Sequence, residues 1–160
     1  MKIKFKGKEM SLVGKQLKVG DVMPDFRVVK NDLSDLSLKD TKGTRVFLSV
    51  PSIDTGVCSI EVAKFINYFK NLDSYCYVVS KDLPFALSRW CQANASDNVI
   101  TTSEYKYMEF AKATGTLIEE LGLLTRAVFV VDSDNKILHV EYVEEVANEP
   151  NYEEVLKFLK

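Results

Sequence analysis

The chain has 160 residues, with 21 lysines and arginines against 23 aspartates and glutamates, which gives a net charge of −2 at neutral pH. Charged residues make up 28% of the chain and hydrophobic residues 46%, a balance that excludes a disordered, collagen-like or coiled-coil protein. This length is typical of one globular domain, which we expect to span residues 1–160.

The charge distribution argues against nucleic acid as a partner, because phosphate binding requires clustered lysines and arginines. The one local excess is at the N-terminus, where lysines alternate with apolar residues: Lys2, Ile3, Lys4, Phe5, Lys6 and Lys8. This alternation favours the solvated face of a strand over an anion-binding arm. The chain has no run of about 18 apolar residues and no apolar segment behind its first charges, so we expect a cytoplasmic protein without a membrane span.

Three cysteines, Cys58, Cys76 and Cys91, and one histidine, His139, limit the chemistry that this chain can support. An odd number of cysteines without a secretory signal is a poor disulfide framework. Their spacing does not match that of zinc sites, so we expect no metal and no other cofactor. A single histidine also leaves little for cysteine–histidine catalysis. A reactive cysteine would therefore need another group to activate it.

The first part of the chain is predicted to begin with a β-hairpin and to reach a buried central strand. The hairpin strands are Ile3–Phe5 and Glu9–Leu12, on either side of a turn at residues 6–8. Short strands are expected at Phe26–Val29 and within Leu33–Leu38. The β-branched, apolar run Arg45–Val50 lies between a glycine and a proline, which is typical of a buried strand.

A helix is predicted from Cys58 to about Asn71, because its apolar residues recur at helical spacing. The elements expected after it are a buried strand at Tyr75–Ser80, a helix at Leu83–Ala93, a strand at Val99–Thr101, a helix at Tyr107–Thr114 that Gly115 ends, a hairpin of Ala127–Asp132 and Ile137–Val143, and a closing helix from Tyr152 to Leu159. Residues 116–125 show no clear helical or strand periodicity in their apolar residues. Alternating strands and helices, followed by a hairpin, predict an α/β fold with a mixed central sheet flanked by helices.

Cys58 is the cysteine whose position most favours reactivity. It follows a strand and a loop that contains Pro51, and it falls in the first turn of the predicted helix. Free backbone N–H groups and the positive end of the helix dipole favour a thiolate there, whereas a buried, inert thiol is the alternative. The Thr55 hydroxyl can either approach the sulfur or cap the helix. Pro51 can either shield the thiolate from water or simply end the strand.

The spacing Pro51-x-x-x-Thr55-x-x-Cys58 resembles the active-site motif of the peroxiredoxins. The longer SVPSIDTGVC at residues 49–58 resembles their bacterial thiol peroxidase subfamily, the atypical two-cysteine type. Further segments resemble that subfamily in the same order: FKGKEMSLVG at 5–14, LKVGDVMPDF at 17–26, SKDLPFALSRWC at 80–91, TRAVFVVD at 125–132 and EPNYEEVLKFL at 149–159. Two positions depart from it, since Ala63 replaces a frequent arginine and Trp90 replaces the more usual phenylalanine.

The resemblance implies a thioredoxin-like fold and an enzyme that reduces hydrogen peroxide and organic hydroperoxides. Cys58 would be the peroxidatic cysteine, whose thiolate attacks the hydroperoxide and becomes a sulfenic acid. Arg126 would stabilise the thiolate and hydrogen-bond the peroxide oxygens. Thr55 would orient the peroxide and Pro51 would keep water off the sulfur. Without the resemblance, Arg126 would be interpreted as a surface arginine before a strand.

Cys91 would be the resolving cysteine, which forms an intramolecular disulfide with Cys58 that thioredoxin then reduces. Its position alone would favour a buried thiol beside Trp90. The two cysteines lie on different predicted helices, so we expect partial unwinding around both when they join. Cys76, inside a buried strand, is predicted to be structural, and His139, in a strand of alternating exposure, is predicted to have no role. The resemblance also implies a homodimer.

A peroxide-responsive redox sensor is the alternative function, in which oxidation of the same cysteine pair reshapes a surface that another protein binds. A general disulfide oxidoreductase is disfavoured because the chain lacks a C-x-x-C pair. A cysteine hydrolase is disfavoured because no histidine is expected near Cys58.

Overall fold

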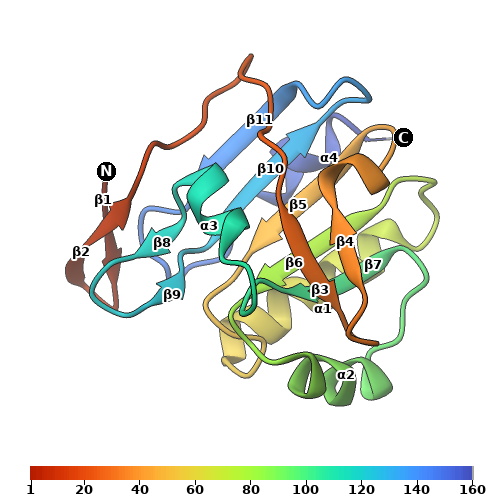
Figure 1. Ribbon diagram of the computed structural model, residues 1–160, viewed down its shortest axis with the longest axis horizontal. Helices are drawn as coiled ribbons and strands as arrows, with labels where there is room; N and C mark the ends of the chain where they lie inside the picture. Colours follow the sequence, from red (N-terminus) through yellow and green to blue (C-terminus); the bar gives the residue numbers. More distant parts are fainter. Residues whose placement is uncertain (160) are drawn as a thin grey trace.

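The computed structural model describes residues 1–159, which form a main β-sheet covered by helices and a smaller β-sheet (Figure 1). The main sheet has seven strands in the order β11-β10-β5-β6-β7-β3-β4, and the smaller sheet has the order β1-β2-β8-β9. The strands are β1 Lys2–Phe5, β2 Lys8–Val13, β3 Arg27–Lys30, β4 Asp35–Ser37, β5 Arg45–Ser49, β6 Cys76–Ser80, β7 Val99–Ser103, β8 Leu117–Ile118, β9 Leu123–Leu124, β10 Ala127–Val131 and β11 Ile137–Tyr142. The helices are α1 Gly56–Phe69, α2 Pro84–Ala93, α3 Glu109–Thr114 and α4 Tyr152–Leu156, with a 3-10 turn η1 at Leu38–Asp40.

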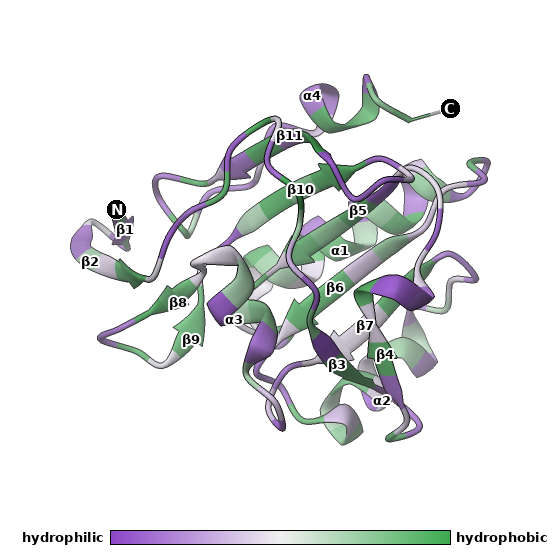
Figure 2. Ribbon diagram, turned by 45° about the horizontal axis from the view of Figure 1, so that its top comes forward, coloured by the Kyte–Doolittle hydropathy of each residue, from purple (hydrophilic) through white to green (hydrophobic). Residues whose placement is uncertain are grey.

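The main sheet is mixed, as the sequence predicts. Strands β5, β6 and β7 are parallel neighbours, whereas β10, β11, β3 and β4 pair antiparallel. Every residue of β5, β6 and β10 is buried, because both faces of the sheet are covered. Along β5, Val46 and Leu48 face one core and Phe47 faces the other. The central strands are accordingly the most hydrophobic part of the ribbon in Figure 2.

Helices α1, α2 and α4 share the core on one face of this sheet. Helix α1 buries Val62, Phe65 and Phe69, and the other two helices add Leu87 and Val155. On the opposite face, α3 contributes an aromatic ring that packs edge-on against rings of the sheet and of the segment before β3. No helix among residues 1–159 is long and apolar enough to cross a membrane.

The N-terminal hairpin β1–β2 is confirmed, and its lysine-bearing face is exposed while Ile3 is buried. The smaller sheet forms because β2 also pairs with β8, in a segment where the sequence showed no clear period. Strands of two residues are too short for alternation to reveal them. The hairpin turn is anchored by Glu145, whose carboxylate accepts hydrogen bonds from the backbone of Lys6 at 2.8 Å and of Gly7 at 2.9 Å. This anchor holds the turn beside the C-terminal segment.

Several predicted boundaries are wrong, and two have a backbone cause. The third helix begins after Met108 rather than at Tyr107, because Met108 has a left-handed φ of 59°. The strand predicted within Leu33–Leu38 is restricted to β4, because Leu33 has a φ of 73°. Smaller differences lie at the ends of other helices and strands: α1 ends at Phe69 rather than Asn71, α4 ends at Leu156 rather than Leu159, and β7 extends to Ser103 rather than Thr101.

Gly115 ends α3, as predicted, at a position that excludes a side chain. Its φ is +65°, and an added Cβ would lie 2.5 Å from the carbonyl oxygen of Lys15. Gly122 has a similar φ of +68° but open space around it.

We predict that Gly115→Ala lowers the free energy of unfolding by about 1 kcal/mol or more beyond the loss caused by Gly122→Ala. Urea unfolding followed by circular dichroism measures both, and equal losses would contradict the crowding argument.

Candidate active site

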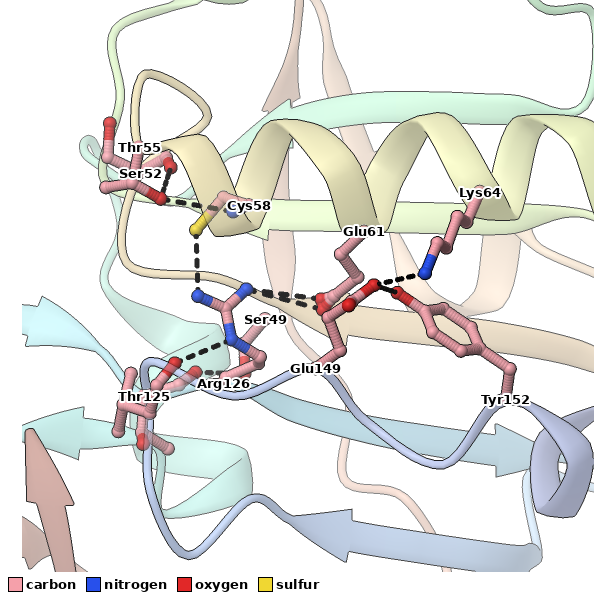
Figure 3. A network of polar contacts seen from close by, with 11 residues as sticks. Ser49, Ser52, Thr55, Cys58, Glu61, Lys64, Thr125, Arg126, Glu149 and Tyr152 are labelled. Atoms are coloured by element: carbon pink, nitrogen blue, oxygen red, sulfur yellow. Dashed lines mark hydrogen bonds and ion pairs between the residues drawn. The ribbon is translucent and has the colours of Figure 1, made fainter.

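The loop after β5 leads directly into the turn of α1 that carries Cys58. Thr55 is the N-cap of this helix, and its hydroxyl oxygen accepts a hydrogen bond from the Cys58 backbone N–H at 3.1 Å (Figure 3). The Thr55 backbone N–H and hydroxyl both donate to the Ser52 carbonyl oxygen at 3.2 Å. Of the two alternatives for this hydroxyl, the structure therefore has the cap. Its predicted role in orienting a peroxide stays a prediction.

The Cys58 sulfur is fully buried and contacts a buried arginine. Arg126 Nη2 donates to Cys58 Sγ at 3.3 Å, and the two residues are 2% and 0% exposed respectively. The interpretation of Arg126 as a surface residue, which its position alone favoured, is therefore wrong. A buried thiolate is costly without a compensating charge, and a guanidinium supplies both charge and a fixed donor.

The other nitrogens of Arg126 hold the guanidinium in place. Its Nε donates to the Val146 carbonyl oxygen at 2.8 Å, and its Nη1 donates to the Glu61 carboxylate at 3.3 and 3.5 Å. The backbone before it is fixed as well, because Ser49 Oγ donates to the Thr125 carbonyl oxygen at 2.7 Å. Figure 3 shows the guanidinium between the sulfur and the carboxylate.

Glu61 is a site residue that the sequence analysis did not identify. It lies three positions after Cys58 in α1, so both side chains occupy the same face of the helix. Its side chain is fully buried, and this burial raises the pKa of the carboxyl group to about 7, although Arg126 acts in the opposite direction. A carboxylate between Cys58 and Phe65 on an apolar helix face was a signal that could have revealed it.

A second carboxylate joins the C-terminal segment to α1 on the outer side of Glu61. Glu149 accepts a hydrogen bond from Lys64 Nζ at 2.8 Å and from the Tyr152 hydroxyl at 2.7 Å. The hydrogen bond from Lys64 is the main cause that holds the pKa of Glu149 below its ordinary value. Figure 3 shows these three groups beside the Arg126–Glu61 pair, as a separate set of contacts.

A cavity of about 270 Å³ lies next to Arg126, the residue that contacts the sulfur, and is lined by three of the predicted residues, Pro51, Thr55 and Arg126. Its remaining wall is mainly apolar and comes from the hairpin turn, the start of α1 and the C-terminal segment: Phe5, Lys6, Gly56, Val57, Val146 and Ala147. The sequence analysis missed this wall because it depends on contacts between segments at opposite ends of the chain. The cavity is large enough to hold a small molecule next to Arg126.

Cys91 lies in α2 and is half-buried, in surroundings different from those of Cys58. Its Sγ is 3.2 Å from Thr101 Oγ1 and 3.6 Å from Asn31 Nδ2. The thiols of Cys58, Cys76 and Cys91 are free. The helices of the two predicted catalytic cysteines are in contact, because the Trp90 indole N–H donates to Ser59 Oγ at 3.2 Å.

Cys76 and His139 take no part in the hydrogen bonds described around Cys58 and Cys91. Cys76 is buried in β6, and this burial raises the pKa of its thiol well above the ordinary value, which keeps it protonated. The alternating exposure predicted around His139 is wrong, because β11 is half-buried along most of its length. The His139 ring stacks on Phe158 with a centroid distance of 5.9 Å.

Known proteins of one family resemble the whole chain. The Redoxin family matches residues 18–156. A thiol peroxidase from Clostridium acetobutylicum is 54% identical over 158 residues, which cover 98% of this chain and 96% of that protein. A thiol peroxidase from Bacillus subtilis is 48% identical over 160 residues, which cover 99% of this chain and 96% of that protein.

Solved structures agree with this similarity. A peroxiredoxin-like protein from Aquifex aeolicus superposes with a TM-score of 0.92 at 38% identity, covering 98% of this chain and 94% of that one. A thiol peroxidase from Chromobacterium violaceum superposes with a TM-score of 0.91 over 99% of this chain and 94% of that one. At 18% identity, the second likeness supports the fold alone.

The raised pKa of Glu61 makes stability depend on pH. The folded state binds this proton more tightly than the unfolded state, so the stabilisation is complete below the ordinary value of 4.5 and is lost as the pH rises through about 7. We predict that wild type loses roughly 2 kcal/mol more unfolding free energy than Glu61→Gln between about pH 5 and pH 8. Urea unfolding at both pH values measures this difference, and equal losses in the two proteins would contradict it.

Proposed function

The chain belongs to the Redoxin family and, within it, to the bacterial thiol peroxidases, and we propose that it reduces hydroperoxides through a cycle of Cys58 and Cys91. It is a peroxiredoxin-type peroxidase, so its general reaction is the thiol-dependent reduction of a peroxide. One observation carries the proposed cycle: Arg126 Nη2 lies 3.3 Å from Cys58 Sγ, beside a cavity that Pro51 and Thr55 line.

In the first step, the Cys58 thiolate attacks the terminal oxygen of the hydroperoxide. A sulfur–oxygen bond forms and the oxygen–oxygen bond breaks, so Cys58 becomes a sulfenic acid and the leaving alkoxide or hydroxide takes up a proton. Negative charge moves from sulfur to oxygen during this step. Arg126 is placed to follow that charge, because its guanidinium is already fixed by Glu61 and Val146 and need not reorganise.

The cavity next to Arg126 is the proposed entrance for the substrate. Pro51 is buried at its wall and limits the access of water to the sulfur. The apolar wall of Phe5, Val146 and Ala147 would suit the carbon chain of an organic hydroperoxide as well as hydrogen peroxide. Hydrogen peroxide and organic hydroperoxides are therefore both proposed substrates.

In the second step, the Cys91 thiol attacks the Cys58 sulfenic acid, a disulfide forms and water leaves. A disulfide requires Cα atoms within about 7 Å, with Cβ atoms that point toward each other. Cys91 instead contacts Thr101, and Trp90 joins the two helices through Ser59. Local unwinding at the start of α1 and near the end of α2 therefore precedes this step, and it breaks the Trp90–Ser59 bond.

A dithiol reductant must then return two electrons to the disulfide by thiol–disulfide exchange. Thioredoxin is the proposed reductant, which rests on the resemblance to two-cysteine peroxiredoxins. A homodimer and a cytoplasmic location stay predictions.

Intact-mass spectrometry after one equivalent of hydroperoxide tests the cycle. We predict that the wild-type chain loses two hydrogen atoms and that peptide mapping locates the new disulfide at Cys58–Cys91. Cys58→Ser should consume no peroxide, because the nucleophile is gone. Cys91→Ser should retain one oxygen on Cys58 and should not turn over with thioredoxin.

Cys76→Ser is the matched control, because it removes a buried thiol that has no part in the proposal. It should form the same disulfide at the same rate as wild type. Normal turnover of Cys91→Ser with thioredoxin would contradict the resolving role, and an unreacted wild-type chain would contradict the whole cycle.

A further inference from the structure

Asp82 connects the segment that leads into α2 with the loop before Cys58. It follows β6 and immediately precedes Leu83, the N-cap residue of α2, the helix that carries Cys91. Its carboxylate reaches across to the loop before Cys58. Oδ1 accepts a hydrogen bond from Ser52 Oγ at 2.7 Å, and Oδ2 accepts one from the Ile53 backbone N–H at 2.7 Å.

Within the loop, further hydrogen bonds connect Ser52 to the start of α1. Ser52 Oγ also accepts from the Asp54 backbone N–H at 3.1 Å, and the Ser52 carbonyl oxygen accepts from Thr55. Thr55 in turn caps α1 at Cys58. A connected series of hydrogen bonds therefore runs from Asp82 through Ser52 and Thr55 to the backbone of Cys58.

On the side of α2, the position of Asp82 is fixed by its own neighbours. Ser80 Oγ donates to Oδ2 at 2.9 Å, and Ser103 Oγ donates to the Asp82 carbonyl oxygen. The adjacent Lys81 is paired with the buried Glu104. The carboxylate of Asp82 thus makes charge-assisted hydrogen bonds to neutral donors, and two of them belong to the loop before Cys58.

We propose that Asp82 is a positioning residue, which holds the loop before Cys58 in its reactive geometry from the segment that leads into α2. This inference rests on the proposed function, since it assigns a role in the two steps of that cycle. The carboxylate favours the first step, because the loop that it holds places Pro51 and Thr55 in the wall of the cavity and leads into the turn that sets Cys58 against Arg126. It opposes the second step, because its bonds hold together the segments that must rearrange before Cys58 meets Cys91.

Rapid-quench mass spectrometry of Asp82→Asn tests this role, because it follows each step separately. The amide has nearly the same shape but cannot accept from both Ser52 and Ile53 on two oxygens. We expect oxidation of Cys58 to be slowed about tenfold or more, whereas conversion of the sulfenic acid to the disulfide becomes faster than in wild type. A merely structural residue would not shift the two steps in opposite directions.

Ser52→Ala removes the same bond from the loop side and completes a double-mutant cycle. The Ser52→Ala and Asp82→Asn double variant should be little slower than the slower single variant, because both changes remove one shared contact. Ser103→Ala is the matched control, since it removes a bond to the backbone of Asp82 and leaves the carboxylate contacts in place. It should slow the first step much less than Asp82→Asn.

Oxidation of Cys58 in Asp82→Asn within about twofold of the wild-type rate would overturn the inference, as would independent, multiplying effects of the two variants. If Asp82→Asn does not fold, a Ser52→Ala rate within about twofold of wild type overturns it alone. A wild-type chain that forms no Cys58–Cys91 disulfide would refute the proposed function instead. In that case the double-mutant cycle still measures the coupling of Asp82 and Ser52 in the oxidation of Cys58.

Discussion

The guanidinium of Arg126 is a buried positive charge, and the arrangement of the site follows from the partners it requires. A buried charge is tolerated only when it is paired and hydrogen-bonded. Arg126 meets this condition with the Cys58 sulfur, the Glu61 carboxylate and the Val146 carbonyl oxygen. Each partner thereby has a fixed position, and the sulfur is held next to a donor before any substrate arrives.

The register of the main sheet makes this contact possible. Strands β5 and β10 pair antiparallel, with Ser49 opposite Ala127, so the end of one strand meets the start of the other. The loop to Cys58 leaves from that end of β5, and Arg126 immediately precedes β10. The C-terminal segment then adds Val146 to the guanidinium and Glu149 to α1. The N-terminal hairpin lies near the same ends of β5 and β10 and completes the cavity wall with Phe5 and Lys6.

Local features of the chain could be predicted, and features that depend on distant contacts could not. The β-branched runs of β5, β6 and β10, the N-terminal hairpin and the position of Cys58 in the first turn of α1 follow from patterns of a few residues. The burial of Arg126 does not, because it depends on a sulfur and a carboxylate that lie far away in sequence. Phe5 lines the cavity because the hairpin is bound to the C-terminal segment, through the Glu145 carboxylate and through backbone hydrogen bonds of Lys4. Glu61 could be predicted only in part. Its position one helical turn after Cys58 was visible in the sequence, but its buried partner Arg126 was not.

Activation of Cys58 by the Arg126 guanidinium is the interaction on which the proposed mechanism most directly depends. Arg126→Lys keeps the positive charge, but a compact ammonium group cannot maintain the fixed fork that joins the sulfur, Glu61 and Val146. The measurement is the second-order rate constant for oxidation of Cys58 by hydrogen peroxide, with circular dichroism to establish that the variant is folded. We predict a loss of about 100-fold or more in a folded Arg126→Lys protein. A folded variant that reacts within about threefold of the wild-type rate would contradict the account.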